Sequence, residues 1–220
     1  MPLPLKKTLG ELRADIQVRL GFGMAGQAGV VNAPLIDSML RSAQEQLYVQ
    51  FDWLELKGVE LRNTGISQQF YDYPADCNVE RITGIFCSWG GQFHELTEGI
   101  SHRDRNFPSS TIPQKYERRD QYELWPVPQA AYQLRIEYEK TLGAFTANSD
   151  RCSLPSEIVY LHALANAKKH YRQPDADTYM SQLDSMLLRI KARHRSQSVY
   201  GRRVTAQTPY DHAPDDSQKV

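Results

Sequence analysis

The residues that could carry out chemistry in this sequence are six histidines, three cysteines and several closely spaced acids. His162 and His170 lie eight residues apart, which is about 12 Å along a helix and too far for both to bind one metal ion. His102 stands near Asp104, but no G-x-S-x-G motif supplies a nucleophile beside them. The cysteines show no C-x-x-C spacing, so we expect reduced thiols. We therefore predict no catalytic residue, no metal site and no cofactor.

Two pairs of acids have a spacing that invites comparison with a glycosidase. They are Glu95 with Glu98, and Glu117 with Asp120. Such an enzyme needs one carboxyl with a raised pKa in an apolar pocket and a second, ionised carboxylate at a fixed separation. The neighbours of all four acids are polar, which is typical of a solvated surface. We predict that the chain is not an enzyme, and a cell-wall hydrolase is the least favoured alternative.

The segment Gly21 to Gly26 matches the pattern G-x-G-x-x-G. This motif binds the pyrophosphate of a dinucleotide when it follows a strand and opens a helix. Here it follows a helical pattern, so a flexible connector between two helices explains the glycines better than nucleotide binding does.

A basic segment without acids extends from Ser185 to Tyr210. Cations at the end of a helix interact favourably with its dipole, which explains the arginines of the last helix but not those beyond it. Arginines with aromatic neighbours are typical of protein-binding hot spots, and they also contact DNA phosphates. Because the net charge of the chain is zero, we favour docking on an acidic protein surface over DNA binding. The residues predicted to dock are Arg195, Tyr200, Arg202, Arg203, Val204 and Tyr210.

Helical spacing predicts two helices near the N-terminus. A capping box of Thr8 and Glu11 opens the first, and Gly21 can close it in a left-handed conformation. Asn32 is predicted to cap the second helix, with a proline tolerated in its first turn. That helix should end near Phe51.

The composition and residue pattern in the middle of the chain are typical of β-strands. Val79 to Trp89 is rich in β-branched and aromatic residues, and Gly90-Gly91 predicts a tight turn into a strand from Gln92 to Leu96. Apolar and polar residues alternate from Tyr132 to Tyr138. This alternation indicates an antiparallel sheet with one buried face.

Helical spacing returns after Ser153, which is predicted to be an N-cap, and Gln173-Pro174-Asp175 separates two C-terminal helices. Residues 196–220 have no periodicity and few aliphatic side chains, so we expect them to be disordered in isolation. No stretch approaches the ~18 apolar residues of a membrane span, and Met1 to Lys7 is too short for a signal peptide. We expect a soluble protein that is made in a cytoplasm.

These patterns predict an α+β fold. An α-helical bundle is formed by the N- and C-terminal helices, with an inserted antiparallel β region and an extended C-terminal tail. The predicted divisions are 1–52 and 151–195 for the bundle, 53–150 for the β region and 196–220 for the C-terminal arm. Zero net charge also favours self-association.

The order of these segments is accompanied by a set of short phrases: Leu35–Leu40, Ala43–Tyr48, Phe51–Trp53, Tyr71–Asp76, Val79–Ile85, Tyr122–Pro128, Tyr132–Tyr138 and Ser153–Pro155. From about Leu5 to Arg195 the chain thereby resembles the head-to-tail adaptor (connector) proteins of short-tailed, podovirus-like bacteriophages, of the tail tubular protein A type. Each phrase is degenerate, so the resemblance depends on their order. The long glycine-rich first connector departs from the family pattern.

The resemblance implies a virion structural protein at the head-tail junction, assembled in the cytoplasm of the host bacterium. Copies of the chain would form a closed ring, a dodecamer, beneath the portal protein. The ring would extend the DNA ejection channel without sequence-specific DNA binding, and it would offer a platform to a downstream tail or nozzle protein. The arm 196–220 would become ordered on the portal. A nucleic-acid-binding module is the main alternative function.

Overall fold

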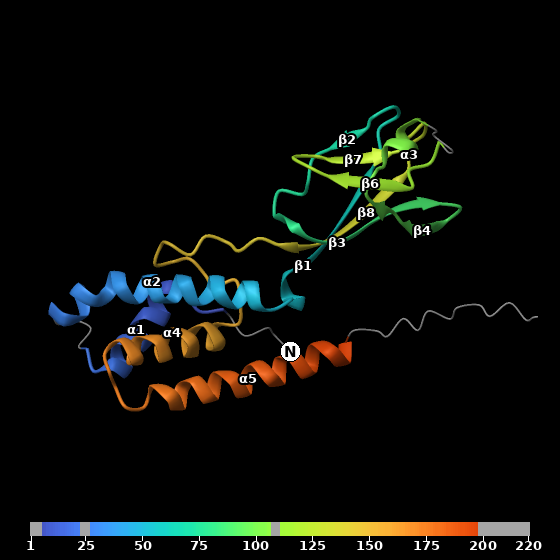
Figure 1. Ribbon diagram of the computed structural model, residues 1–220. Helices are drawn as coiled ribbons and strands as arrows, with labels where there is room; N and C mark the ends of the chain where they lie inside the picture. The colour runs from blue at the N-terminus through green and yellow to red at the C-terminus, as the bar shows by residue number, and fades with distance from the viewer. Residues whose placement is uncertain (1–5, 23–26, 107–110, 198–220) are drawn as a thin grey trace, which may run out of the picture.

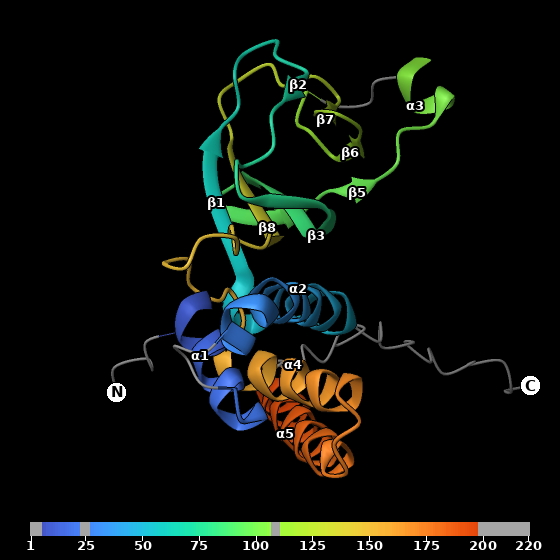
Figure 2. The ribbon, with the colours of Figure 1, turned by 90° about the vertical axis from the view of Figure 1, so that its left-hand side faces the viewer.

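The computed structural model describes residues 6–22, 27–106 and 111–197, with the backbone alone for 27–31 and 193–197. Helices from both ends of the chain lie side by side, and a strand-rich part stands against one side of them (Figures 1 and 2). The fold therefore combines helices with mainly antiparallel sheets, which confirms the predicted α+β class.

The first helix, α1 (Leu9–Leu20), begins and ends as its sequence predicts. The Thr8 hydroxyl accepts a hydrogen bond from the Glu11 N–H at 3.3 Å, and the Glu11 carboxylate accepts one from the Thr8 N–H at 2.8 Å. These two bonds satisfy donors that the first turn leaves unpaired. Gly21 ends the helix with a φ of 80°, a left-handed conformation that costs glycine little.

The second helix, α2 (Gln27–Gln50), begins earlier than predicted, so Asn32 as its N-cap was wrong. The Asn32 side chain instead accepts a hydrogen bond from the Tyr171 hydroxyl at 2.9 Å, which ties α2 to the end of a later helix. Pro34 lies inside α2, where a proline usually costs about 3 kcal/mol. The burial of apolar side chains along the same helix offsets this cost. These side chains are Ile36, Leu40, Ala43 and Leu47.

The two C-terminal helices are α4 (Ser156–His170) and α5 (Ala176–Gln197), and the predicted break at Gln173–Asp175 separates them. Ser153 as the N-cap of α4 was wrong, because the helix begins at Ser156. The Ser153 hydroxyl is used elsewhere: it accepts a hydrogen bond from the Gly143 N–H at 2.9 Å.

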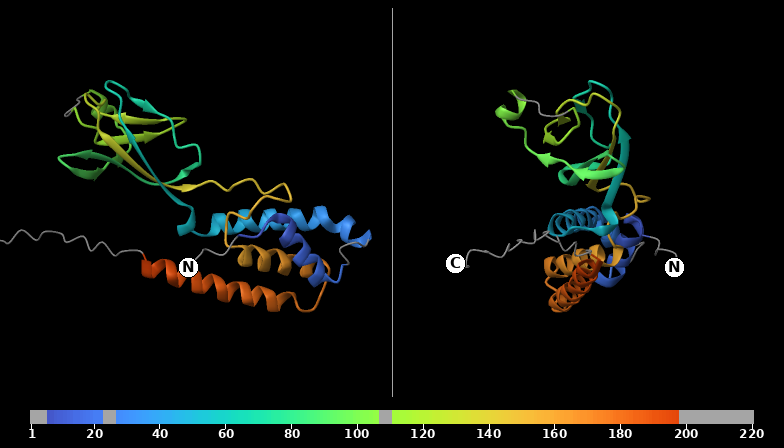
Figure 3. Two further views of the ribbon diagram at one scale, coloured as in Figure 1. Left: turned by 180° about the vertical axis from the view of Figure 1, so that it is seen from behind. Right: turned by 90° about the vertical axis from the view of Figure 1, so that its right-hand side faces the viewer.

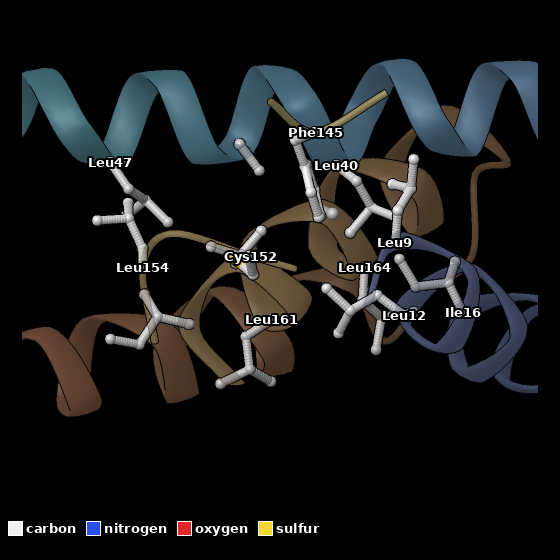
Figure 4. Close-up of a cluster of buried hydrophobic side chains, with 14 of the residues drawn as sticks. Leu9, Leu12, Ile16, Leu40, Leu47, Phe145, Cys152, Leu154, Leu161 and Leu164 are labelled. Carbon is white, nitrogen blue, oxygen red and sulfur yellow. The ribbon is translucent and has the colours of Figure 1, made fainter. Parts of the chain in front are cut away.

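One hydrophobic core lies between these four helices (Figure 4). It unites residues that are far apart in the sequence, and its fully buried members include Leu12, Ile16, Leu40, Leu47, Ile158 and Leu164. Full burial of one such side chain stabilises the fold by roughly 1.5–3 kcal/mol. Phe145 and Leu154 enter the same core from the connection between the strands and α4. Among the side chains described for helix α5, residues 176–192, Leu183 alone is buried, so this part of α5 is the least embedded in the core.

The larger sheet has the strand order β1-β8-β3-β4, and every neighbouring pair is antiparallel. Its strands are β1 (Lys57–Asn63), which follows the 3-10 turn η1 (Leu54–Leu56), β8 (Gln133–Lys140), β3 (Cys77–Trp89) and β4 (Gln92–Glu95). Gly90 and Gly91 join β3 to β4 with φ angles of 62° and 80°, which confirms the predicted tight hairpin.

The smaller sheet has the order β2-β7-β6-β5. Its strands are β2 (Phe70–Tyr71), β7 (Tyr122–Trp125), β6 (Lys115–Arg118) and β5 (Thr97–Glu98). A wholly antiparallel region was expected, but β5 and β6 run parallel. They can do so because a longer connection, which contains the short helix α3 (His102–Asn106), separates them.

The two sheets share one core, in which Leu134, Ile136 and Tyr138 form the predicted buried face of β8. Tyr122 and Leu124 of β7 enter this core from the smaller sheet. The strand-rich part lies on the α2 side of the helices, away from α5 (Figure 3).

An ion-pair network attaches α3 to the smaller sheet. Arg105 donates two hydrogen bonds to the carboxylate of Glu123, one of them at 2.8 Å, and a third to Glu117 at 3.1 Å. Glu123 is only 2% exposed. Its carboxylate also accepts a hydrogen bond from the side-chain amide of Gln69 at 2.6 Å. The Arg105 guanidinium holds the pKa of Glu123 below its usual value. The pair therefore stabilises the folded state when Glu123 is ionised.

We predict that Arg105→Ala lowers the free energy of unfolding by about 3 kcal/mol near neutral pH, because it leaves a buried carboxylate without its cation. A lowered folded pKa adds stability above the unfolded pKa of about 4.3, and this stability is lost as the pH falls through the folded pKa. The deficit should therefore shrink in acid. Urea denaturation at several pH values measures it, and Arg105→Ala with Glu123→Gln is the control that should recover part of the loss. An equal deficit at every pH would contradict the prediction.

Candidate docking surface at the end of helix α5

The structure locates the base of the predicted docking segment and not its remainder. Arg195 lies in the last turns of α5, where only the backbone is described. The other predicted docking residues lie outside the described part of the chain: Tyr200, Arg202, Arg203, Val204 and Tyr210. The geometry of the candidate surface is therefore that of the helix end from which this segment departs.

The end of α5 projects past α4 toward the place where α2 passes into the strands (Figure 1). The ammonium group of Lys191 lies 4.5 Å from the centroid of the Phe51 ring, in cation–π geometry. Phe51 directly follows α2, and its ring packs edge-on against Trp53 at 5.7 Å between centroids. The base of the docking segment thus contacts the junction between helices and strands.

Arg81, from β3, connects the end of α2 to the larger sheet. Its guanidinium donates to the backbone oxygens of Val49 at 3.0 Å and Phe51 at 3.2 Å. The last carbonyls of a helix have no partner within the helix, and a cation is favourable beside them. Arg81 also pairs with buried Glu139 of β8 at 2.9 Å and lies over the Tyr48 ring at 4.5 Å. One side chain thereby fixes the end of α2 against the larger sheet.

Three further hydrogen bonds stabilise the junction. The Tyr48 hydroxyl donates to the Lys140 carbonyl at 3.2 Å and accepts from the Asn78 side chain at 2.8 Å. The indole N–H of Trp53, which is 1% exposed, donates to the Leu47 carbonyl at 3.0 Å. The end of α5 therefore contacts, through Lys191, a junction that is held by both α2 and the larger sheet.

Charge is unevenly distributed along α5. Its acids, Asp177 and Asp184, lie in the first half, whereas exposed Arg189 and Lys191 lie in the second. Leu188 is 66% exposed beside these cations. The second half of the helix therefore presents positive charge with an apolar side chain. This combination suits an acidic partner surface with an apolar patch.

The acids that could have formed a catalytic pair are held in ion pairs or are exposed. Glu98 accepts two hydrogen bonds from Arg118, at 2.6 and 2.8 Å, and Glu95 is exposed. Near His102, the Lys115 ammonium and Ser101 hold the pKa of Asp104 well below its usual range. A glycosidase acid needs the opposite shift. These residues stabilise the smaller sheet and the turn of α3.

The described residues contain no cluster of three or more His, Cys, Asp or Glu side chains placed to hold a metal ion. His162 lies on α4, where burial lowers its pKa. Within the same ranges, none of the helices has the length and apolar character needed to cross a bilayer. Gly21, the first glycine of the G-x-G-x-x-G pattern, closes α1, whereas Gly23 and Gly26 lie outside the described residues.

Sequence reasoning missed the junction residues. Phe51 was noted as the end of the second helix, and with Trp53 as part of a phrase, but no contact was predicted for either. Nothing in the local sequence around Arg81 indicates that it caps a helix thirty residues earlier. The one available signal was an aromatic pair directly after a predicted helix.

All three cysteines are free and buried. Burial raises the pKa of Cys77, Cys87 and Cys152 to about 11. The Cys152 thiol also donates to the Gln44 side-chain oxygen at 3.0 Å. Since the thiolate is the reactive form, these side chains are inert at neutral pH.

We predict that N-ethylmaleimide labels the native thiols on the order of 100-fold more slowly than the unfolded thiols near pH 8, because so little thiolate is present. Mass spectrometry of the native and urea-unfolded protein measures the labelling. Raising the pH toward 10 in the native state should accelerate it. Rapid labelling of one cysteine in the native protein would show that its site is open.

Comparison with known proteins completes the description of the chain. The family model described as SU10 adaptor protein matches residues 7–207, which include all four long helices, both sheets and the first residues beyond α5. No curated protein matches the chain. Because the match covers most of the sequence, the chain belongs to the SU10 adaptor protein family and is a structural adaptor protein of a bacteriophage.

Proposed function

We propose that the chain is the head-to-tail adaptor of a short-tailed phage, of the tail tubular protein A type, and that its copies form a dodecameric ring beneath the portal protein. The ring extends the DNA channel and gives the downstream tail or nozzle protein a platform. The observation that supports this function is the family match, which continues past α5 to residue 207. The segment that follows the rigid helix end is thus part of what the family shares.

In this proposal α1, α2, α4 and α5 act as one helical bundle and form the wall of the ring. The support is their common core, which joins helices from both ends of the chain. The strand-rich part reaches away from that wall on the side opposite to α5 (Figure 3). A bundle on the portal side and sheets on the tail side would place the two partners at opposite ends of the adaptor.

The C-terminal arm, residues 196–220, docks on the portal in this proposal. The arm follows the positively charged half of α5, in which Lys191 contacts Phe51 at the junction. Arginines and tyrosines of the arm supply charge and apolar anchors, and the entropy of ordering is lost only on docking. The phage DNA passes through the lumen without base-specific contacts, which agrees with a net charge of zero.

Ending the chain after Arg195 should leave the thermal unfolding midpoint unchanged and weaken portal binding at least about tenfold, because hot-spot arginines and aromatics each contribute more than about 1 kcal/mol. Surface plasmon resonance on immobilised portal measures the binding. The matched control ends after Tyr210, which retains all six predicted docking residues. Equal portal binding by the two shortened chains would refute the role of the arm.

Reversal of charge in the basic segment distinguishes portal docking from the alternative of nucleic-acid binding. Arg202→Glu with Arg203→Glu should weaken portal binding about tenfold and leave DNA retention on a gel unchanged. The control, Arg41→Glu with Lys169→Glu, makes the same change of charge at exposed positions of α2 and α4. Tight DNA binding that falls steeply with salt, and that the arginine changes abolish, would instead identify a nucleic-acid-binding module.

A further inference from the structure

The larger sheet has two open edges of opposite direction. In the order β1-β8-β3-β4 every neighbouring pair is antiparallel, so β1 and β4 run in opposite directions. β1 stands at the margin of the strand-rich part (Figure 2). Sheets with this polarity can be placed side by side in one orientation, because β4 of one copy is then antiparallel to β1 of the next.

The edge strand β1 has a regular backbone, and its charged side chains are Lys57, Glu60 and Arg62. Its pairing with β8 is continuous over seven residues, without a bulge or a proline. Val59 and Leu61 are 55% and 56% exposed on its outer face. On the other edge, β4 exposes Phe93, at 40%, beside Glu95. Both edges of the sheet therefore carry exposed apolar side chains that a paired strand would cover.

On both edge strands, alternate residues direct their backbone N–H and C=O groups away from the sheet. Directly after β1 and before β8, the Thr64 N–H donates to the Tyr132 carbonyl at 2.8 Å and continues their ladder. The alternation of an antiparallel ladder then turns the N–H and C=O groups of Lys57 and Val59 away from β8. The tight hairpin makes Trp89 and Gln92 its closing pair, so the same alternation turns those of the β4 residues Phe93 and Glu95 outward.

We propose that β1 of one copy pairs antiparallel with β4 of the next copy, with Val59 opposite Phe93 and Lys57 opposite Glu95. This inference rests on the proposed ring and names one contact that builds it. In this register both pairs match: an apolar side chain faces an aromatic one, and a cation faces an acid. A shift by two residues places Val59 opposite Glu95, and Lys57 then lies beyond β4.

The occupant of the edge is a second copy because the two edges of one sheet complement each other and not themselves. Pairing β1 with another β1 is a two-fold contact that ends at a dimer. Pairing β1 with β4 is a head-to-tail contact that uses a different surface on each copy. Such contacts generate a closed ring when the rotation between successive copies closes. The sheets of successive copies then form one continuous antiparallel ladder around the ring.

Paired cysteines test this contact in the full-length chain. Opposed residues of an antiparallel pair lie about 5.5 Å apart at Cα, within the reach of a disulfide. Val59→Cys with Phe93→Cys should give a ladder of covalent multimers on a non-reducing gel after mild oxidation. Neither single variant can extend beyond a dimer. The native cysteines are buried and should remain unlinked.

The matched control is Asn63→Cys with Phe93→Cys, which uses another exposed position of β1, about 13 Å farther along the strand. Negative-stain microscopy of the unmodified protein shows independently whether rings form. Rings without the Val59–Phe93 ladder, or with a stronger ladder from the control pair, overturn the strand contact and leave the adaptor ring standing. Neither rings nor ladders would overturn both the ring and the contact.

Charge exchange provides a second measurement on the same contact. Lys57→Glu and Glu95→Lys should each lower the association constant between copies by up to about fivefold, as measured by sedimentation. The combination of both changes should restore it. Because both side chains are exposed, the variants should fold normally, which thermal unfolding checks. An additive loss in the double variant would show that the two residues do not face each other.

Discussion

The contact of Arg81 with the end of α2 is the constraint on which the relation between helices and strands depends. A helix that ends at the surface of another part leaves carbonyl oxygens without donors. Arg81 supplies these donors from β3, and its own charge is balanced by Glu139 of the neighbouring strand. The cation, the helix end and the sheet therefore form one unit. Because Lys191 contacts Phe51 in the same unit, the direction of α5 is tied to it as well.

Local signals in the sequence predicted local structure well. The capping box at Thr8, the glycine hairpin and the alternation along β8 each specify a conformation within a few residues. The errors arose where a distant partner decided the outcome. Asn32 and Ser153 have the chemistry of N-caps, but Tyr171 and Gly143 occupy their side chains instead. The candidate docking segment was located only at its base, since most of it lies beyond the described residues.

In the proposed function, the contacts with partners lie at the edges and ends of the fold. The helices bury their apolar faces in one core, and the sheets bury theirs in another. The exposed apolar side chains include Val59 and Phe93 on the edge strands of the larger sheet, and positive charge lies along the second half of α5. A surface can differ in this way between regions while the net charge remains zero.

The burial of the three thiols has a consequence for the life of the particle. A virion component leaves the reducing interior of the cell and then persists in aerated surroundings without repair enzymes. Oxidation of cysteine to sulfenic acid and beyond begins from an accessible thiolate. Because Cys77, Cys87 and Cys152 remain protonated inside packed cores, oxygen and peroxides find little to attack. The three thiols are therefore protected from oxidation and from disulfide exchange while the protein is folded.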